Sequence, residues 1–313
     1  MSYDKATDVI RMDIPHASPF MKPGPGQYYY IYQPMTWKGW ECHPFSLGSW
    51  QTSSLGSSTP APLSPNNTTP SSPMSDITAV SLFDKDIEKA ITMDGTTIHT
   101  VSSHDDLSGQ SSTATSLTKW IRPYDGWTKR LRDNCLTSLN NISRPYILIE
   151  GPYGHKAPLH TYDTVMLVCG GTGISAALPY IQDHITRAEE GTTKTTSLKL
   201  VWTTKQERFV RDLCDKELAS ALRRDDFEAI LSATNGVATA DDEEKHAAAY
   251  EIQTSRPDVR SLVMGLAKES AGSTVAVLVC GPTAMVDEAR VATKKALLET
   301  TRDIGYYEEA FAW

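Results

Sequence analysis

The sequence predicts a two-domain α+β chain, in which an antiparallel β domain precedes an α/β domain built on a parallel sheet. The first observation is length, because 313 residues exceed the usual size of a single domain. The second is a strand–turn–strand pattern near the N-terminus. The third is a strand–loop–helix pattern that occurs three times after residue 160. We place the boundary so that the domains cover residues 1–152 and 153–313.

The first domain begins with two segments that have the composition of β-strands. Residues 8–15 (DVIRMDIP) and 27–32 (QYYYIY) are β-branched or aromatic, and a Pro/Gly turn separates them. The strand pattern returns at residues 117–121 and at residues 144–150 (RPYILIE). Together these segments predict an antiparallel sheet unit, which ends at the Gly and Pro residues of 151–154.

Two polar segments interrupt this pattern. Residues 51–75 consist mainly of Ser, Thr, Pro, Asn and Gly, so they carry too little apolar surface to order themselves by burial. We expect a disordered insertion that extends weakly to residue 116, although residues 77–91 are apolar enough for a short helix or strand. Residues 238–256 form a second insertion that is polar and rich in charge.

The second domain shows the clearest periodicity. Residues 164–169 (TVMLVC), 198–203 (LKLVWT) and 275–280 (VAVLVC) are continuous apolar runs, which are typical of parallel strands buried on both faces. A segment with helical spacing follows each run, and we expect these helices at residues 174–188, 207–223 and 284–298.

Composition excludes several classes of protein. The net charge is −8 and the 30 basic residues are scattered, so no electrostatic footprint for nucleic acid exists. The five cysteines lack C-x-x-C spacing, which argues against a disulfide framework or a metal site and favours a reducing compartment. No run reaches the roughly 18 to 20 apolar residues of a membrane helix, and no signal peptide is present, so we expect a soluble chain.

A glycine loop follows the first apolar run of the second domain. The segment Val168–Ser175 (VCGGTGIS) lies between a predicted strand and a predicted helix, where backbone amides and a helix N-terminus can hold phosphate. A tight turn without any ligand is compatible with the same residues. The loop contains Gly170, Gly171, Thr172, Gly173 and Ile174.

The other two strand–helix junctions carry further candidates. Lys205, with Arg208 nearby, follows the second run, where a cation can meet a ribose phosphate, and this favours NADPH over NADH. A solvated helix start explains both cations equally well. Cys280, Gly281 and Pro282 end the third run at the sheet edge where α/β proteins bind ligands, although a buried cysteine often only packs.

Six short motifs follow one another along the chain: Pro25–Tyr28 (PGQY), His43–Ser46 (HPFS), Gly126–Thr128 (GWT), Gly151–Gly154 (GPYG), the glycine loop and Cys280–Pro282 (CGP). In this order they resemble the ferredoxin-reductase-like flavoproteins, and within them the ferric reductase and NADPH oxidase branch. The terminal YEEAFAW, from Tyr307 to Trp313, is similar to the tail of fungal ferric reductases. The resemblance covers nearly the whole chain apart from the two insertions.

The resemblance implies an FAD site in the first domain. It places His43 near the pyrophosphate, Pro44 and Phe45 against the flavin, and Ser46 toward the ring nitrogen that accepts hydride. Ser49 matches a small polar residue that often follows this motif. The resemblance further implies that the FAD pyrophosphate is bound by backbone amides and a hydroxyl of Gly126, Trp127 and Thr128, a role that amide nests allow. Core packing alone also explains Trp127.

The resemblance implies an NADPH site in the second domain. The loop from Gly170 to Ile174 would cradle the pyrophosphate, and Cys280 would lie beside the nicotinamide. Phe311 or Trp313 would cover the flavin face until nicotinamide displaces it. Ser46 and Cys280, one from each domain, are therefore the residues expected at the reacting rings.

The implied activity is hydride transfer from NADPH to FAD, followed by single-electron transfer toward haem and ferric iron. As part of a ferric-chelate reductase, the chain would lie on the cytosolic face of the plasma membrane. Two departures matter: the family's membrane bundle with its haems is missing from this chain, and only seven residues precede the strand expected at residue 8, so either the flavin barrel is incomplete or the chain is a fragment.

Three other interpretations stay open from the sequence. The first is a fragment of an NADPH oxidase that ultimately produces superoxide. The second is a truncated nucleotide-binding module without catalytic activity. The third is a free-standing soluble reductase of small haem or iron–sulfur proteins.

Overall fold

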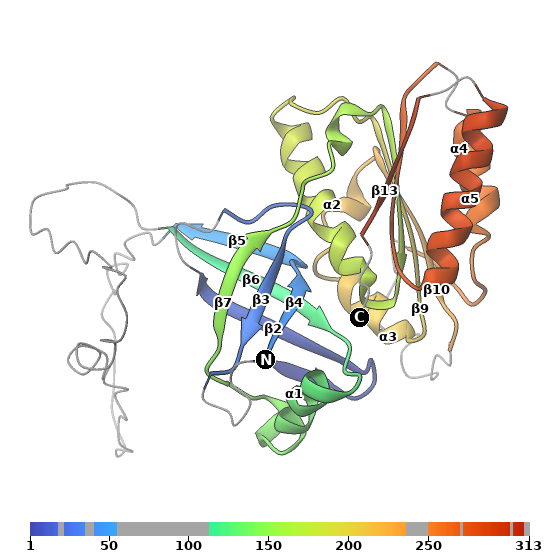
Figure 1. Cartoon of the computed structure of the whole chain (residues 1–313). Coiled ribbons are helices and arrows are strands. Elements are labelled where there is room, and N and C mark those ends of the chain that lie inside the picture. Colours follow the sequence, from blue (N-terminus) through green and yellow to red (C-terminus); the bar gives the residue numbers. More distant parts are fainter. Residues whose placement is uncertain are drawn as a thin grey trace, which may run out of the picture. The chain divides into compact units, whose positions relative to one another are not determined.

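The computed structural model describes residues 1–17, 22–34, 41–54, 113–235, 250–269, 272–300 and 303–309 (Figure 1). Within residues 1–53 and 113–313 they form one compact unit that contains both predicted domains. The antiparallel strands all precede residue 154 and the parallel strands all follow residue 163.

The first domain contains two antiparallel sheets and one helix, α1 (Gly126–Leu136). One sheet has the order β1-β2-β6-β5, with strands at Ser2–Asp4, Val9–Ala17, Thr113–Ile121 and Ser49–Ser54. The other has the order β4-β3-β7, with strands at Cys42–Ser46, Tyr28–Tyr32 and Leu148–Tyr153.

Alternation of side chains explains the core between these sheets. On β3, Tyr29 and Ile31 are fully buried while the three tyrosines between and beside them are half-buried. Trp127 and Leu131 of α1 join the same cluster as Tyr29. The chain crosses from one sheet to the other at Gly48, whose amide donates to the Thr118 carbonyl over 2.9 Å. A Cβ at Gly48 would overlap the ring of Trp120, so only glycine fits this crossing.

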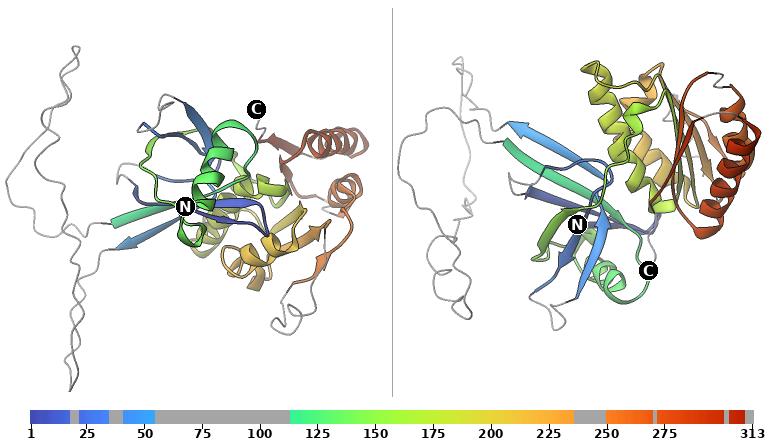
Figure 2. Two further views of the ribbon diagram at one scale, coloured as in Figure 1. Left: turned by 90° about the horizontal axis from the view of Figure 1, so that it is seen from below. Right: turned by 45° about the horizontal axis from the view of Figure 1, so that its top comes forward.

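The second domain is a parallel sheet of order β11-β10-β9-β8-β12-β13. The strands span Ile252–Gln253, Phe227–Ala233, Ser197–Thr204, Thr164–Gly170, Val275–Cys280 and Ile304–Glu308. Helices cover both faces of the sheet (Figure 2), which explains why the central strands are continuous apolar runs. One face packs against α2 (Ile174–Glu189) and α3 (Glu207–Cys214), and the other against α4 (Val259–Glu269) and α5 (Thr283–Glu299).

The predicted fold class is confirmed, and so are the three apolar strands, which are β8, β9 and β12. Helices α2 and α5 also match their predicted segments within two residues at each end. The helix expected over residues 207–223 was wrong in length, because α3 ends at Cys214. Leu218 and Ala221, which suggested a longer helix, are instead buried from a turn and a short 3₁₀ segment.

The limits of both insertions differ from the prediction. The first was expected over residues 51–116, yet β5 continues to Ser54 and β6 begins at Thr113. Residues 55–112, which include the candidate segment 77–91, lie outside the described residues. Of the second insertion, residues 250–256 are described, and they contain β11, which pairs with β10.

A strand does precede the one predicted from residue 8. Residues Ser2–Asp4 form β1, which pairs antiparallel with β2, and Asp4 lies opposite Val9 in the register. The expectation that too few residues remain for this strand was therefore wrong, because three residues are enough for the pairing.

Contacts between side chains and backbone join the two domains. Arg11 on β2 donates from Nη1 to Oε1 of Glu217 over 2.8 Å, and Gln182 on α2 donates to the carbonyl oxygen of Trp50 over 3.0 Å.

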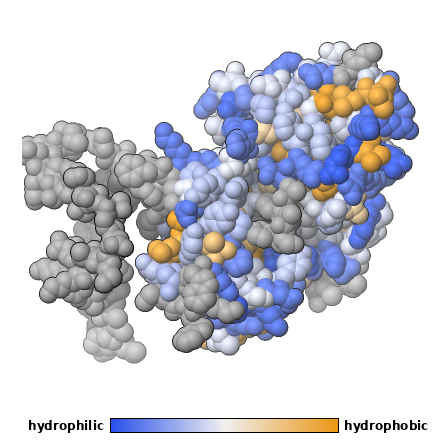
Figure 3. Space-filling view, in the orientation of Figure 1, coloured by the Kyte–Doolittle hydropathy of each residue, from blue (hydrophilic) through white to orange (hydrophobic). Residues whose placement is uncertain are grey.

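Most of the face seen in Figure 3 is hydrophilic, and its apolar areas are small. Among the helices in the described ranges, none combines the length and the apolar character needed to cross a membrane.

Candidate functional site

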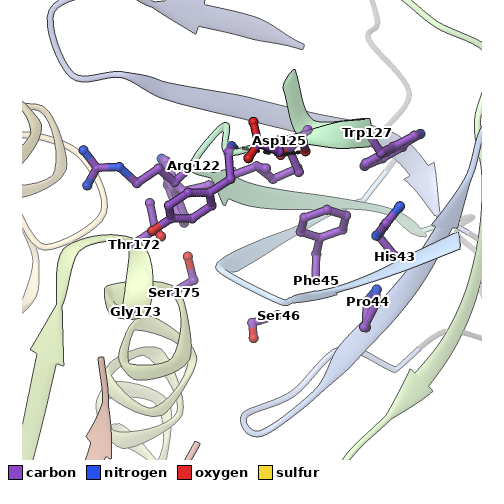
Figure 4. A pocket seen from close by; sticks show the side chains of 14 residues that line it. His43, Pro44, Phe45, Ser46, Arg122, Asp125, Trp127, Thr172, Gly173 and Ser175 are labelled. Carbon is purple, nitrogen blue, oxygen red and sulfur yellow. Dashed lines mark hydrogen bonds between the residues drawn. The ribbon is translucent and has the colours of Figure 1, made fainter. Parts of the chain in front are cut away.

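A cavity of about 570 Å³ lies between the strands of the first domain and the glycine loop of the second (Figure 4). This volume falls in the range of pockets for small molecules and cofactors. The cavity brings together segments that are more than a hundred residues apart in the sequence. Its lining consists of His43, Pro44, Phe45, Ser46, Trp120, Ile121, Arg122, Tyr124, Asp125, Trp127, Thr128, Thr172, Gly173 and Ser175.

Strand β4 supplies one wall of this cavity. It is the end strand of its sheet in the order β4-β3-β7, a position where Pro44 is tolerated because one edge of the strand needs no partner. The ring of His43 stacks on Trp127 with centroids 5.1 Å apart, and Phe45 lies 5.6 Å from the same indole. In Figure 4 the three rings lie together on one side of the cavity. They form an aromatic wall of the kind that accepts a flat heterocycle.

The imidazole of His43 is kept toward its neutral form. Partial burial lowers the pKa of His43, and the nearby Arg130 lowers it further, while Glu41 acts in the opposite direction. Arg130 and Glu41 themselves form an ion pair beside the ring. The wall therefore presents an aromatic surface rather than an added cation.

The N-terminus of α1 contributes open backbone amides to the same cavity. Gly126 begins the helix with φ +60°, and Asp125 at the N-cap makes no side-chain cap. Thr128 accepts a hydrogen bond from the Tyr124 amide over 3.0 Å and donates to the Asp125 carbonyl over 3.2 Å, which orders the turn. Amides at a helix start attract an anion, and Arg122, which lines the cavity, adds a cation. The Asp125 carboxylate in the same lining opposes them.

The glycine loop forms the opposite wall. Gly171 adopts φ +57°, which favours glycine. A Cβ on Gly173 would overlap the carbonyl oxygen of Cys280, and a Cβ on Gly170 would overlap the ring of Pro282. The loop and the Cys280–Pro282 turn therefore pack backbone against backbone, which leaves no room for side chains between them.

The first turn of α2 carries the feature that best fits a phosphate. Ser175 is 4% exposed and lines the cavity, and its hydroxyl has no hydrogen-bond partner among the described residues. Buried hydroxyls are normally paired, so an unpaired one at a helix start beside open amides fits an anionic oxygen. The first turn of α2 contains no acidic residue that would repel such an anion.

Cys280 ends β12 next to this loop. Its side chain is 1% exposed, and burial raises the pKa of its thiol to about 12. The thiol is consequently protonated at neutral pH. Cys280 contacts Gly173 but is not part of the cavity lining. Glu309, which follows β13, donates its amide to the Val279 carbonyl over 2.9 Å, and burial raises the pKa of its carboxyl group.

Fewer than half of the candidate residues line the cavity. His43–Ser46, Trp127, Thr128, Thr172 and Gly173 line it. Trp127 lines the cavity and also belongs to the core cluster, so the packing interpretation is confirmed, while its role in binding a cofactor stays a prediction. Three candidates outside the lining, Gly126, Gly171 and Ile174, are sequence neighbours of lining residues, and Cys280 lies against Gly173. Gly170, Gly281 and Pro282 pack against one another and are not part of the lining.

Three described candidates lie elsewhere. Ser49 is the first residue of β5 and does not line the cavity, and Lys205 is exposed in the turn after β9. Arg208, considered together with Lys205, lies 3.5 Å from a carboxylate oxygen of Asp4 in the first domain. Phe311 and Trp313 lie outside the described residues.

Sequence reasoning missed Arg122, Ser175 and Lys119. Arg122 follows directly after β6, and a cation at the end of a strand just before the Gly126 turn was a detectable signal. Ser175 was quoted at the end of the loop but given no role. Lys119 is fully buried, and period-two alternation with Leu117 and Ile121 already places it on the inward face of β6.

Comparison with known proteins agrees with this arrangement. A family described as "Ferric reductase NAD binding domain" matches residues 162–294, and one described as "FAD-binding domain" matches residues 2–55. Ferric reductase transmembrane component 6 of Saccharomyces cerevisiae is 28% identical over 209 residues, which cover 62% of this chain and 29% of that protein. Ferric reduction oxidase 7, chloroplastic, of Arabidopsis thaliana is 31% identical over 83 residues, or 23% and 11% of the two chains.

Solved structures of similar fold share little sequence with this chain. The cytochrome b5 reductase domain of Ulva prolifera nitrate reductase gives a TM-score of 0.53 at 8% identity, covering 98% of this chain and 94% of that one. A flavohemoglobin from Malassezia yamatoensis gives 0.52 at 16% identity, covering 99% and 58%. The alignments span less than a third of the length of the two curated relatives.

Proposed function

We propose that this chain, which matches an FAD-binding domain and the NAD-binding domain of ferric reductases, passes electrons from NADPH through FAD toward ferric iron. One observation carries the proposal: the HPFS strand and the glycine loop, from different domains, line one cavity. When bound, FAD accepts a hydride from NADPH and releases electrons singly.

The FAD half of the site uses the residues of the first domain. Phe45 and Trp127 offer apolar ring faces to the flavin, and the Ser46 hydroxyl at the wall supplies a hydrogen-bond donor for a ring nitrogen. The amides from Gly126 to Thr128 and the guanidinium of Arg122 hold the pyrophosphate. His43, Pro44 and Ser49 complete the binding segment.

The NADPH half uses the residues of the second domain. The loop Gly170–Ile174 and the Ser175 hydroxyl hold the pyrophosphate, and Lys205 pairs with the ribose phosphate. Cys280, Gly281 and Pro282 border the nicotinamide, and the protonated thiol of Cys280 acts as a small contact surface rather than as a nucleophile. Phe311 and Trp313 cover the flavin face when nicotinamide is absent.

Hydride transfer needs no acid or base, so the chain's own task is orientation and exclusion of water. We place the FAD domain at residues 1–152 and the NADPH domain at residues 153–313, with Ser46 and Cys280 bordering the reacting rings. The acceptor is ferric iron in a chelate, or a haem in a membrane domain of a longer protein, with this part on the cytosolic side of the plasma membrane. The curated relatives, which are named as ferric reductases, ferric/cupric reductases or ferric reduction oxidases, favour iron over oxygen as the final acceptor.

A visible spectrum tests the proposal directly. The purified chain is mixed with FAD, freed of excess cofactor and titrated with NADPH without oxygen. We expect a protein-bound yellow absorption band that NADPH bleaches, followed by reduction of an added ferric chelate. A chain that stays colourless after reconstitution would contradict the proposal. A higher yield of superoxide than of ferrous chelate in the full-length parent would reassign the final acceptor to oxygen.

A further inference from the structure

Lys119 is a lysine in the middle of an apolar core. It lies on the inward face of β6 between Leu117 and Ile121, and its side chain is 0% exposed. Lysine is almost never buried in this way unless it has partners. Its hydrogen-bond partners are two main-chain carbonyls: Nζ donates to the oxygen of Phe45 over 2.9 Å and to that of Ser46 over 3.3 Å. The same nitrogen lies 4.5 Å from the centre of the Tyr29 ring.

These carbonyls belong to the residues that form the aromatic wall and the hydroxyl of the cavity. Successive carbonyls of a strand point in opposite directions, so one amine reaches both only where the strand bends. The bend lies just before the chain crosses between the sheets, where the Leu47 amide donates to the Gln27 carbonyl over 2.9 Å. Lys119 therefore fixes the end of β4 from inside the core.

We propose that Lys119 is a positioning residue for FAD, whose amine holds the Phe45–Ser46 backbone in place and takes up a proton when FAD binds. This inference rests on the proposed FAD site. Burial lowers the pKa of Lys119 to about 7, so in the free chain its amine changes charge near neutral pH. The FAD pyrophosphate, which we propose to lie in the cavity that Phe45 and Ser46 also line, would favour the charged form of the amine.

The described groups packed around the amine add no competing charge. Tyr29 on β3 is neutral, because burial raises the pKa of its phenol to about 12. Met12 is the register partner on β2, and the helix α1 contributes Trp127 and Leu131 to this core. Arg11 on β2 reaches Glu217 of the second domain instead.

His43 on β4 stacks on Trp127, and Arg130 of α1 pairs with Glu41 beside that ring. Asp13 on β2 accepts a hydrogen bond from Thr118 on the opposite face. Lys119 is thus the described group of this core whose charge FAD binding is expected to change.

The direction of the pH effect follows from linkage. If bound FAD raises the pKa of Lys119, binding takes up a proton in the interval between the free and the bound pKa. The affinity for FAD then falls as pH rises from about 7, by about tenfold for each unit by which the pKa is raised.

The test measures FAD binding by the full chain through quenching of flavin fluorescence, between about pH 6 and about pH 8.5. Lys119→Met keeps the length and apolar stem of the side chain but removes the donors and the charge. We expect Lys119→Met to bind FAD about tenfold or more weakly than wild type at the acid end and to show no pH slope. Calorimetry in buffers of different ionisation enthalpy should show proton uptake in wild type and none in the variant.

Two further variants separate positioning from simple loss of stability. Leu117→Ala empties a fully buried site on the same face two residues away, so it lowers stability but should keep the pH slope and the proton uptake. Lys119→Gln keeps an uncharged hydrogen-bond donor, so it should recover part of the affinity for FAD but none of its pH slope. This variant replaces Lys119→Met if Lys119→Met does not fold.

The outcomes are distinct. The inference is overturned if Lys119→Met, or Lys119→Gln where that variant replaces it, binds FAD with the affinity and the pH slope of wild type. A loss of the pH slope in Leu117→Ala would also overturn it. If the wild-type chain binds FAD with no pH slope and no proton uptake, the inference fails while the proposed function stands. If it binds no FAD at any pH, the proposed function itself fails.

Discussion

Gly173 lies where the glycine loop meets the Cys280 turn, and its backbone is an ordinary right-handed helical one with φ −59°. The need for glycine is therefore steric rather than conformational: a Cβ there would overlap the Cys280 carbonyl. The close contact between these two loops also shapes the cavity wall where the NADPH pyrophosphate is proposed to lie. A single methyl group tests whether this close packing matters.

Gly173→Ala should push the glycine loop away from β12 and weaken NADPH binding by about tenfold or more, since overpacking a tight contact costs about 1–3 kcal/mol. The measurement is NADPH affinity by equilibrium binding, with the melting temperature recorded alongside. Gly265→Ala is the matched control, because a Cβ at this position of α4 meets open space. The control should leave NADPH affinity unchanged and stabilise the fold by about 0.5–1 kcal/mol. Equal NADPH affinity in both variants would contradict the steric argument.

The cysteines allow a second test at the scale of residues. Cys42 is exposed, while Cys135, Cys169, Cys214 and Cys280 are buried. Burial raises the pKa of Cys214 and of Cys280 to about 12, and that of Cys169 well above its ordinary value. Alkylation requires the exposed thiolate.

A thiol reagent applied to the native chain at mildly alkaline pH should therefore label Cys42 alone, as read by peptide mass spectrometry. Cys42→Ala should abolish the labelling, and the denatured chain should be labelled at all five cysteines. Rapid labelling of Cys280 in the native chain would show that its site at the end of β12 is open to solvent.

Strand β6 shows how one element serves both the fold and the site. Its inward face carries Leu117, Lys119 and Ile121, and its end leads to Arg122 and the N-terminus of α1. The pKa of Lys119 is about 7 in the folded chain and has its ordinary value of 10.5 in the unfolded chain. Between these two pH values the unfolded chain therefore binds more protons than the folded chain. Stability should therefore rise with pH through this interval, and the cost of burying the ammonium is greatest below about pH 7.

Urea unfolding of the chain without cofactors measures this effect. Between about pH 7 and about pH 9, the free energy of unfolding of wild type should gain about 2 kcal/mol relative to Lys119→Met, the variant without the titrating amine. Taking the difference between the two chains cancels the cysteines and other groups that titrate in both. Parallel curves for the two chains would show that Lys119 keeps an ordinary pKa when folded.

At the scale of the whole molecule, the cavity exists only if the two domains keep their contact. Arg11 and Glu217 form the ion pair that joins β2 to the segment after α3, and Glu217 is only 11% exposed. The second carboxylate oxygen of Glu217 is buried without a partner among the described residues. Loss of Arg11 would leave this carboxylate without its cation.

Arg11→Met should lower the free energy of unfolding by about 1–3 kcal/mol, and FAD binding should weaken with it. The double variant Arg11→Met with Glu217→Met should recover much of that loss, because no buried charge is then left unpaired. Arg132→Met is the control, since Arg132 pairs on the surface with its neighbour Asp133 and should contribute little. A loss in the double variant equal to the sum of the two single losses would indicate that the pair is not coupled.

The local pattern of the sequence was sufficient to predict the fold class, the strands β8, β9 and β12, the helices α2 and α5, and the motifs that resemble the flavoprotein family. These features depend on neighbouring residues: a run such as VAVLVC must be covered on both faces, and glycines between a strand and a helix permit a close turn. The sequence could not show that α3 ends at Cys214, because this depends on how Leu218 and Ala221 are buried in the core. It also could not show that β1 forms from three residues, which pair with the next strand and bridge to Ile142 far along the chain.

Only the tertiary structure brought the HPFS strand, the start of α1 and the glycine loop around one cavity, and only it showed the surroundings of Arg122, Ser175 and Lys119. Sequence determines which face of β6 carries Lys119, since side chains alternate along a strand. Its partners, however, are carbonyls more than seventy residues earlier, brought within reach by the crossing of the chain at Gly48. The physical reason is that burial and hydrogen bonding between distant segments are properties of the packed chain, which no local pattern contains.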